Sequence, residues 1–435
     1  MTVHRVVGSL LALAVFASGA LAQSAKLGES ALVDSCHQVK LNLDLKGKIT
    51  FQSQGKTQTV EHNAVATHAF TERVLEGKGA VAEKSARVYE TASVTIAGQT
   101  RTLRTSHNLI VAHRVKEQLI SYSPKGPLFG EEMELLEHFD TLSLPGLLPG
   151  TEVKVGDSWN VAPAVVQAIC GLDALDAQTK QQVTCTFTAL DGHMAHVTIQ
   201  GTVRGIQLGA AVSIHIDAKS KLLFDLKDKR IVELEWRQAD ERQQGPATPN
   251  LAADVTIKLK RTPIPTPNEL GQFALLTVPD GPPPAKLTNI LHREAKGKYE
   301  FQRSREWQDV GEHSGQRVLK LVTARGDHLA DAILTLWKGP RISSAKDFKQ
   351  QMDDTPGWKQ DGDSQVDDAL KHPNGYTVYR VTGAGKMEGV AAFRMAYLIG
   401  DASGQQLLVT FLSPPSQVNN LEARDQTLVD SIEFK

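Results

Sequence analysis

The pattern of apolar and polar residues predicts a chain built mainly from β-strands. From residue 38 onward, apolar residues occupy every second position. They are Val39, Leu41, Leu43 and Leu45. Because the side chains of a strand alternate between its two faces, this period predicts a strand with one buried and one wet face. Lys46-Gly47-Lys48 then predicts a turn, and the run with Ile49 and Phe51 predicts the second strand of a hairpin.

Further strands and two short helices are predicted up to residue 261. The strands are expected at 87–96, 102–113, 119–122, 183–189, 196–203, 206–216, 222–226, 231–236 and 251–259. Acidic residues in a first turn predict a helix at 131–139, and Pro163 opens a second one that ends at Gly171. Many strands and few helices favour a β-rich domain at 23–261, folded as an antiparallel, strongly curved sheet or half barrel.

A proline-rich linker separates this domain from a second one. Proline clusters at 262–267 and 279–284 bracket a stretch with little periodicity. Spacers of this composition are extended and semi-rigid. We therefore place the linker at 262–297 and the second domain at 298–435.

The second domain is expected to be α+β, an antiparallel sheet with helices on its faces. Its strands are predicted at 299–302, 317–324, 329–337, 376–382, 390–399 and 405–412. A helix is predicted at 343–353, with Ser343 or Ser344 as its cap. A last helix is expected from Pro414-Pro415 to residue 428.

Short motifs in the second domain resemble a known family. Tyr299-Glu-Phe301, Glu306-Trp307 and the closing Leu428-Val-Asp-Ser-Ile-Glu-Phe434 resemble the PsbP/Mog1-like α/β/α sandwich family. The proline that this family usually has before the tryptophan is absent, and Arg305-Glu306 stands there. The resemblance implies the sandwich fold. It implies no common activity, and it supplies no site residues.

The first domain is similar to uncharacterised exported bacterial β-rich proteins. The similarity is carried by Glu137-His-Phe-Asp140, Leu147-Leu-Pro-Gly150 and Val155-Gly-Asp-Ser-Trp159. On architecture alone, a half barrel like that of lipoprotein carriers is a further alternative.

Residues 1–22 predict a secretory signal peptide. Arg5 precedes an apolar run at 6–17, and Ala20-Leu-Ala22 forms a small-residue cleavage site. The run is shorter than the about 20 residues of a membrane helix, and no later stretch has that character. We therefore expect a periplasmic or secreted protein with no integral membrane segment in the mature chain.

The charge balance excludes one class of partner. Removal of residues 1–22 takes away Arg5 from the 48 basic residues and none of the 49 acidic ones, so the formal charge changes from −1 to −2. A protein that binds nucleic acid needs a basic surface to neutralise phosphates. We therefore expect no nucleic-acid partner.

The three cysteines, Cys36, Cys170 and Cys185, leave two alternatives open. An oxidising compartment permits a disulfide between Cys170 and Cys185, which would stabilise the fold by roughly 3 kcal/mol in the chain-entropy model. Alternatively, all three are small buried hydrophobic residues. None directly follows the cleavage site, so no lipid anchor is expected.

Histidines are the candidates for a metal site. His193 and His196 are three residues apart, so on a strand they point to opposite faces. His62 and His68 would lie about 20 Å apart along one strand, too far to share an ion. His138 has acidic neighbours and could bind metal or respond to pH, although a capped or core-facing histidine is favoured. We expect no metal and no cofactor.

Two loops have the composition of ligand-binding motifs. Gly383-Ala-Gly-Lys-Met-Glu-Gly389 lacks the Ser or Thr after the lysine, and the helix, of a phosphate-binding loop, so a hairpin turn is favoured. The acidic residues of 361–368, with Asp353 and Asp354 upstream, could hold calcium. They lack the EF-hand spacing, so a solvated loop is favoured.

The sequence contains no recognisable nucleophilic motif. It has no Gly-x-Ser-x-Gly elbow and no His-Glu-x-x-His pair. Cys36 and His37 are adjacent, and adjacent side chains of a strand diverge, so they do not form a thiolate–imidazole pair. Asp157 and Trp159 are expected to form a turn with a core anchor.

Together these patterns predict an exported binding protein that is not an enzyme. The β-rich domain would bind a ligand on its concave face, in the most concrete form a lipid or other hydrophobic ligand, and the second domain would contact an unidentified protein. Two alternatives stay open. One is a cell-envelope hydrolase whose site, around His138 or Asp157 for example, assembles only in three dimensions. The other is a structural scaffold.

Overall fold

The structure is a computed structural model that describes residues 23–435 except 54–55, 80, 116–117, 138, 179–181, 295 and 297. Most of the described chain is antiparallel β-sheet with few helices, as the alternating pattern predicts. The predicted signal peptide at 1–22 lies outside the described residues. In the described part of the chain, no helix combines the length and the apolar character needed to cross a lipid bilayer.

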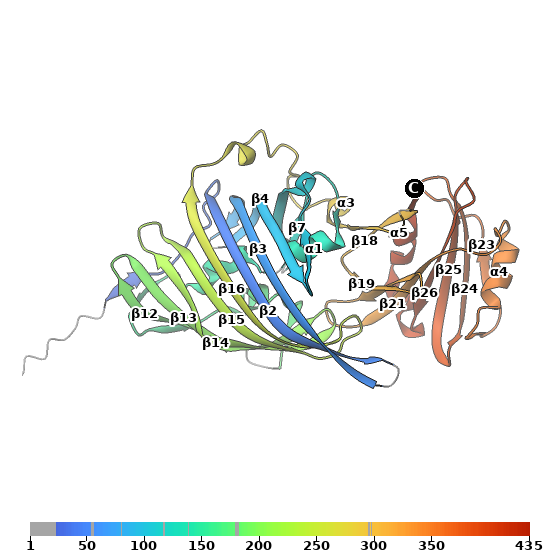
Figure 1. Cartoon of the computed structure of the whole chain (residues 1–435), viewed down its shortest axis with the longest axis horizontal. Helices are drawn as coiled ribbons and strands as arrows, with labels where there is room; N and C mark the ends of the chain where they lie inside the picture. The colour runs from blue at the N-terminus through green and yellow to red at the C-terminus, as the bar shows by residue number, and fades with distance from the viewer. Residues whose placement is uncertain are drawn as a thin grey trace, which may run out of the picture.

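The first region forms a sheet of thirteen strands within the described residues. Their order is β10-β12-β13-β14-β15-β16-β2-β3-β4-β6-β7, with β11 beside β13 and β5 beside β4. The bounds are β2 (Cys36–Ser53), β3 (Lys56–Lys78), β4 (Val81–Ile96), β5 (Gln99–Thr102), β6 (Leu109–Val115), β7 (Gln118–Tyr122), β10 (Ser158–Asn160), β11 (Ala174–Leu175), β12 (Gln182–Asp191), β13 (Met194–Gln207), β14 (Ala210–Asp225), β15 (Arg230–Arg242) and β16 (Asn250–Ile264). Figure 1 shows them side by side in one strongly curved sheet. A separate pair joins β1 (Ser24–Lys26) to β9 (Glu152–Lys154).

Gly47 lies in the middle of β2, so the turn predicted at 46–48 is wrong. β2 pairs with β3 without interruption through this position. A Cβ atom on Gly47 would lie 2.8 Å from the carbonyl oxygen of Ala252 on the neighbouring β16. The glycine therefore permits a close approach of two strands that are distant in sequence, which local sequence cannot show.

A turn at Leu208-Gly209 divides the strand predicted at 206–216. Both residues have a positive φ, +50° for Leu208 and +77° for Gly209. β13 ends before the turn and β14 begins after it. β14 then continues through the segment predicted at 222–226, across an irregularity in its pairing with β15.

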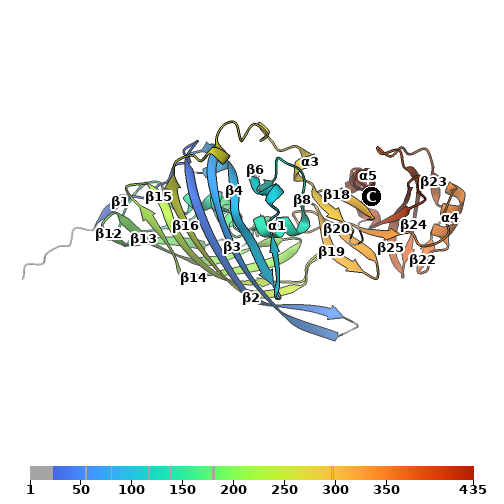
Figure 2. The same ribbon diagram turned by 45° about the horizontal axis from the view of Figure 1, so that its top comes forward.

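The curved sheet wraps around three short helices of its own chain. These are α1 (Gly130–Leu136), the 3-10 helix η2 (Thr141–Leu147) and α2 (Pro163–Ile169). Figures 1 and 2 show α1 inside the curve of the sheet. Their apolar side chains share one hydrophobic core with inward side chains of the sheet, such as Phe187 and Trp236. The two predicted helices are thus confirmed, α1 being shorter than expected. Much of the concave face is filled by the protein itself.

The second region contains an eight-stranded sheet in its described part, ordered β19-β20-β21-β26-β25-β24-β22 with β23 beside β24. The bounds are β19 (Trp307–His313), β20 (Gln316–Val322), β21 (His328–Leu336), β22 (Trp358–Gln360), β23 (Gln365–Asp367), β24 (Thr377–Met387), β25 (Val390–Gly400) and β26 (Gln406–Ser413). Phe348 and Met352 of α4 (Ala345–Asp353) pack with Val381 and Leu398 in one cluster. The core that includes Phe411 instead contains residues of the 3-10 helix η4 (Pro415–Leu421) and of α5 (Arg424–Asp430).

Helix ends in this region follow local chemistry. The hydroxyl oxygen of Ser344 accepts a hydrogen bond from the backbone N–H of Asp347 at 3.1 Å, which confirms the predicted cap of α4. The single last helix that was predicted is instead divided into η4 and α5. Glu422 and Ala423 between them have φ values of +48° and +62°, and a right-handed helix cannot continue through that conformation.

A small mixed sheet joins the two regions. Its order is β27 (Glu433–Phe434), β18 (Tyr299–Arg303), β17 (Ile290–Arg293) and β8 (Leu128–Phe129). β8 belongs to the first region and pairs with β17 in parallel. Beside it, Arg305 forms an ion pair with Glu137 and donates a hydrogen bond to the backbone oxygen of Ser121 at 2.6 Å.

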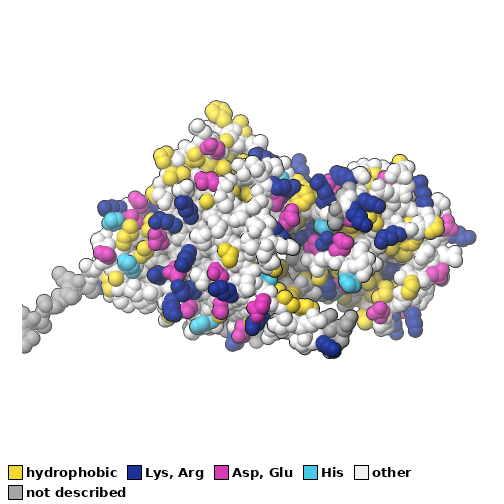
Figure 3. Space-filling view, in the orientation of Figure 1, with side chains coloured by type: hydrophobic (Ala, Val, Ile, Leu, Met, Phe, Trp, Pro, Cys, Tyr) yellow, Lys and Arg dark blue, Asp and Glu magenta, His cyan; other side chains and the backbone are white. Residues whose placement is uncertain are grey.

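The proline-rich segment is attached to the first sheet along much of its length. It contains the short helices η3 (Asn268–Leu270) and α3 (Ala285–Thr288). Leu270 is fully buried against Ala86 and Leu109. Nζ of Lys84 donates a hydrogen bond to the backbone oxygen of Pro279 at 2.7 Å. Between these anchors Leu276 is exposed, and hydrophobic side chains gather over this segment at the top of Figure 3.

Replacing Leu270 by alanine should loosen this segment. Truncation of a buried leucine removes apolar contacts and leaves a cavity, which costs about 2–5 kcal/mol. We expect Leu270→Ala to lower the free energy of unfolding by about 2 kcal/mol, because a surface segment can partly collapse. We also expect faster limited proteolysis between residues 271 and 284.

The matched control is Leu276→Ala, because Leu276 is 76% exposed. This substitution should change the free energy of unfolding by less than about 0.5 kcal/mol. Equal effects of the two substitutions would contradict the docking of this segment through Leu270.

Candidate functional site

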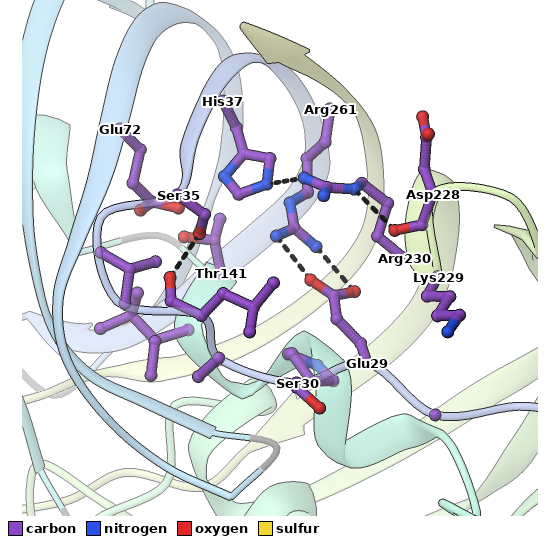
Figure 4. A pocket seen from close by; sticks show the side chains of 17 residues that line it. Glu29, Ser30, Ser35, His37, Glu72, Thr141, Asp228, Lys229, Arg230 and Arg261 are labelled. Atoms are coloured by element: carbon purple, nitrogen blue, oxygen red, sulfur yellow. Dashed lines mark hydrogen bonds and ion pairs between the residues drawn. The ribbon is translucent and has the colours of Figure 1, made fainter. Parts of the chain in front are cut away.

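A cavity of about 300 Å³ lies where several strands of the first sheet begin or end. β15 begins there at Arg230, and His37 near the start of β2 meets Arg261 near the end of β16. The segment 28–35 and η2 also contribute to the lining. We call this cavity the strand-end pocket, and Figure 4 shows its side chains.

Strand pairing brings the charged residues of the pocket together. His37 has the same parity along β2 as the buried residues Val39 and Leu41, so it points to the inside of the sheet. Antiparallel pairing places Glu72 of β3 directly opposite His37. On the other side of β2, Arg261 lies opposite Val39, and it is also buried.

Two buried ion pairs account for most of the charge around the pocket. Arg261 holds Glu29 through two hydrogen bonds, of 2.8 Å from Nη2 and 3.1 Å from Nη1. Arg87 donates to Glu72 from Nε at 2.8 Å. Burial alone would raise the pKa of Glu72, but Arg87 and Arg261 hold that pKa below its ordinary value. Glu72 is therefore ionised, and each of the two carboxylates is paired with an arginine inside the protein.

His37 is a neutral imidazole inside this charged cluster. Burial, together with the nearby Arg261 and Arg230, lowers the pKa of His37 to about 3. Its Nε2 contacts Nη1 of Arg230, so Nε2 accepts and the proton lies on Nδ1. Nδ1 is buried and has no hydrogen-bond partner among the described residues.

Arg230 has no carboxylate partner in the described part of the chain. Its Nε donates to the backbone oxygen of Asp228 at 3.2 Å, and its other contact is the neutral His37. In Figure 4 the side chain of Asp228 points away from the guanidinium. Lys229 lies next to it at the rim. Asp228 and Lys229, which have opposite charges, are exposed. Apart from the two buried ion pairs, Arg230 is therefore the charged side chain of the lining that is partly buried.

The three cysteines are buried and unbridged, which was the second of the two alternatives left open by the sequence. Cys36, Cys170 and Cys185 are all free and buried, so the structure holds no bridge between Cys170 and Cys185. Burial raises the pKa of the Cys185 thiol to about 12 and raises that of Cys170 as well. Thiols of this kind are poor nucleophiles.

The adjacent residues Cys36 and His37 diverge, as predicted. Sγ of Cys36 lies 3.3 Å from the hydroxyl of Thr266, whereas His37 lines the strand-end pocket. Strand geometry therefore separates the thiol from the imidazole.

The other candidate histidines do not converge. His193 lies in the turn before β13, 3.7 Å from Asp225, and His196 lies on β13. His62 and His68 lie on β3. Within the described residues, no group of three or more His, Cys, Asp or Glu side chains could hold a metal ion. His138 is outside the described residues.

The two loops of the second region have structural roles. Gly383–Gly389 spans the end of β24 and the turn to β25, which confirms the hairpin. In the acidic segment, Ser364 donates a hydrogen bond to Asp353 at 2.8 Å, and Asp367 forms an ion pair with Arg380.

Asp157 and Trp159 form the predicted turn and anchor. A carboxylate oxygen of Asp157 accepts a hydrogen bond from the backbone N–H of Lys154 at 2.8 Å. The indole Nε1 of Trp159 donates to the backbone oxygen of Leu147 at 2.9 Å. Asp157 is thus bound within its own turn.

The sequence contains a signal for the strand-end pocket that lies outside its short motifs. His37, Glu72 and Arg261 occupy inward positions of alternating strands, where apolar residues are expected. Their parity marks them as buried polar residues, and such residues need partners. Glu29 and Arg230 carry no such signal. Glu29 lies outside the regular strands, and Arg230 is the first residue of β15.

Comparison with known proteins provides weak structural neighbours only. No family model and no curated protein matches the sequence. A cyanobacterial PsbP from Synechocystis aligns with 34% of this chain and 92% of its own at 15% identity and a TM-score of 0.24. The Ran-binding protein Mog1p of Saccharomyces cerevisiae aligns with 34% of this chain and 95% of its own at 13% identity and a TM-score of 0.25. A DUF1329 family protein from Desulfovibrio piger aligns with 56% of this chain and 93% of its own, at 10% identity and a TM-score of 0.13. Likenesses this weak are suggestive only and say nothing about function.

Acid should destabilise the protein in part through His37. An unfolded histidine titrates near pH 6.5, whereas the native His37 has a pKa of about 3. Between these values the unfolded chain binds a proton that the native protein does not, so stability falls as the pH falls below 6.5. From pH 7.5 to pH 4.5, His37 should lower the free energy of unfolding by about 3 kcal/mol.

Urea unfolding at pH 7.5 and pH 4.5 measures this loss. His37→Gln keeps an acceptor for Arg230 but does not titrate. Its loss of unfolding free energy from pH 7.5 to pH 4.5 should therefore be smaller than that of the unmodified protein by about 3 kcal/mol. His313→Gln, at an exposed position, should behave like the unmodified protein. If His37→Gln loses as much unfolding free energy between pH 7.5 and pH 4.5 as the unmodified protein, the pKa of native His37 is not lowered and this prediction is wrong.

Proposed function

We propose that this protein is an exported, non-enzymatic binding protein whose first region takes a small anionic ligand in the strand-end pocket. The observation that carries the proposal is the Arg230 guanidinium, which lines the cavity without a carboxylate partner among the described residues. A guanidinium offers a planar fork of donors that matches a carboxylate or phosphate. Charge-assisted hydrogen bonds of this kind are stronger than neutral ones.

The buried charges of the lining support an anion over a cation, and the exposed Asp228 and Lys229 have opposite charges. Glu29 and Glu72 are each already held by an arginine, so neither is free to attract a cation. Breaking such a buried pair costs about 3–5 kcal/mol, because it leaves an uncompensated charge. His37 is neutral and holds Arg230 in place.

Carriage of a large apolar ligand on the concave face receives less support. The side chains of α1, η2 and α2 occupy that face and belong to its hydrophobic core. A lipid would have to displace them. The polar strand-end pocket, in contrast, is already formed.

Hydrolytic activity also receives less support. A general base needs a free nitrogen or oxygen within reach of its substrate. Nε2 of His37 is occupied by Arg230, and Asp157 is bound within its own turn.

For the second region we infer a PsbP/Mog1-like α/β/α sandwich that contacts a protein partner. The inference is supported by α4 and α5, which contribute to separate hydrophobic clusters of the same sheet. It is also supported by the motifs of residues 299–307 and 428–434.

Replacing Arg230 by glutamine should abolish anion binding. We expect at least one of hexanoate, succinate and inorganic phosphate to raise the melting temperature of the mature protein by a few degrees. A ligand at 100 times its Kd adds about 2.7 kcal/mol to stability, and Arg230→Gln should lose this response. Thermal unfolding with increasing ligand concentration measures it.

The control variant is Arg325→Gln, which changes an exposed arginine outside the pocket and should respond like the unmodified protein. If the unmodified protein responds to none of the three anions, or Arg230→Gln responds equally, the proposed function is wrong.

A further inference from the structure

The strand-end pocket has a second wall that is apolar. Val74 and Ala82, on neighbouring strands, form a small hydrophobic cluster with Leu142 of η2, and Ala31 packs against it. All four residues line the pocket. In Figure 4 the side chains drawn only in carbon lie on the left, opposite Arg230 and Lys229.

We propose that the ligand is a small amphipathic carboxylic acid, with its carboxylate on Arg230 and a short aliphatic tail on the apolar wall. This inference rests on the proposed function and specifies the ligand class. A ligand with a second charge would bring that charge against Val74, Ala82 and Leu142. The hydroxyls of Ser35 and Thr141 also line the pocket, but they are neutral and already bonded, Ser35 to the backbone oxygen of Leu32 and Thr141 to Arg87. Burial of an unpaired charge is strongly unfavourable.

The size of the cavity limits the length of the tail. Its volume of about 300 Å³ is at the lower end of the range for small-molecule sites. A water molecule takes about 30 Å³ in the liquid, so the cavity holds roughly ten groups of that size. A carboxylate with a chain of about six to eight carbons fills this space, and a long-chain fatty acid exceeds it.

The surrounding contacts favour a preformed site. Glu29 of the covering segment is tied to Arg261, so the segment 28–35 is attached to the sheet without a ligand. Thr141, at the start of η2, accepts a hydrogen bond from Arg87 at 2.7 Å, which fixes the apolar wall relative to the charged one. A rigid pocket loses little freedom on binding.

Calorimetric titration of the mature protein with acetate, butanoate, hexanoate, dodecanoate, succinate and inorganic phosphate tests this inference. Each methylene buried should tighten binding roughly fourfold. We therefore expect affinity to rise from acetate to hexanoate and to fall again for dodecanoate, which is too long for the cavity. Succinate and phosphate should bind much more weakly than hexanoate.

Two variants locate the tail. Ala82→Leu places a larger side chain in the space beside the apolar wall. It should weaken the binding of hexanoate at least tenfold and leave the binding of acetate nearly unchanged. Leu32→Ser changes a lining residue that is 60% exposed, so it should fold normally and weaken hexanoate a few-fold.

The outcomes separate this inference from the proposed function. If succinate or phosphate binds as tightly as hexanoate, or affinity does not change with chain length, the inference is wrong and anion binding stands. If no anion binds, both are wrong. If hexanoate binds but neither variant weakens it, the tail does not lie on this wall and the inference is again wrong.

Discussion

The pairing of β2 with β3 on one side and β16 on the other is the constraint on which the first region depends. β2 is matched to both neighbours without a register shift, from Cys36 onward. The pairs β3–β4 and β13–β14 do shift in register, and such irregularities bend a sheet. A slip of one residue would turn every inward side chain of β2 outward. The register of β2 therefore decides both the hydrophobic core and the position of His37.

The same register places charges where a core would otherwise continue. His37 and Glu72 face each other at the end of the apolar run, and Arg261 lies beside them. Buried ion pairs add little net stability, although breaking one is costly. The pairs Glu29–Arg261 and Glu72–Arg87 are therefore best understood as geometric ties. Glu29–Arg261 attaches the covering segment to the sheet, and Glu72–Arg87 joins β3 to β4. Neither pair uses Arg230, which keeps no carboxylate partner among the described residues.

The filling of the concave face is connected to the junction between the two regions. α1 begins at Gly130, directly after β8 has paired with β17 of the mixed sheet. Phe129 of β8 also lies under the guanidinium of Arg104, whose carbon is 3.7 Å from the ring centroid. A ligand that displaced α1 would therefore disturb the attachment of the second region. This coupling favours a small pocket at the strand ends over a large cavity on the concave face.

The sequence by itself determined the features that depend on local patterns: the β-rich composition, α2, the Ser344 cap of α4, the Gly383–Gly389 hairpin and the divergence of Cys36 and His37. Local patterns misplaced a turn at Gly47, because its role is set by a strand about 200 residues away. Only the tertiary structure assembled the strand-end pocket, in which Glu29 and Arg261 are 232 residues apart. The physical reason is that strand pairing acts across the whole chain, and sequence periodicity reports which face a residue occupies but not which strand lies next to it.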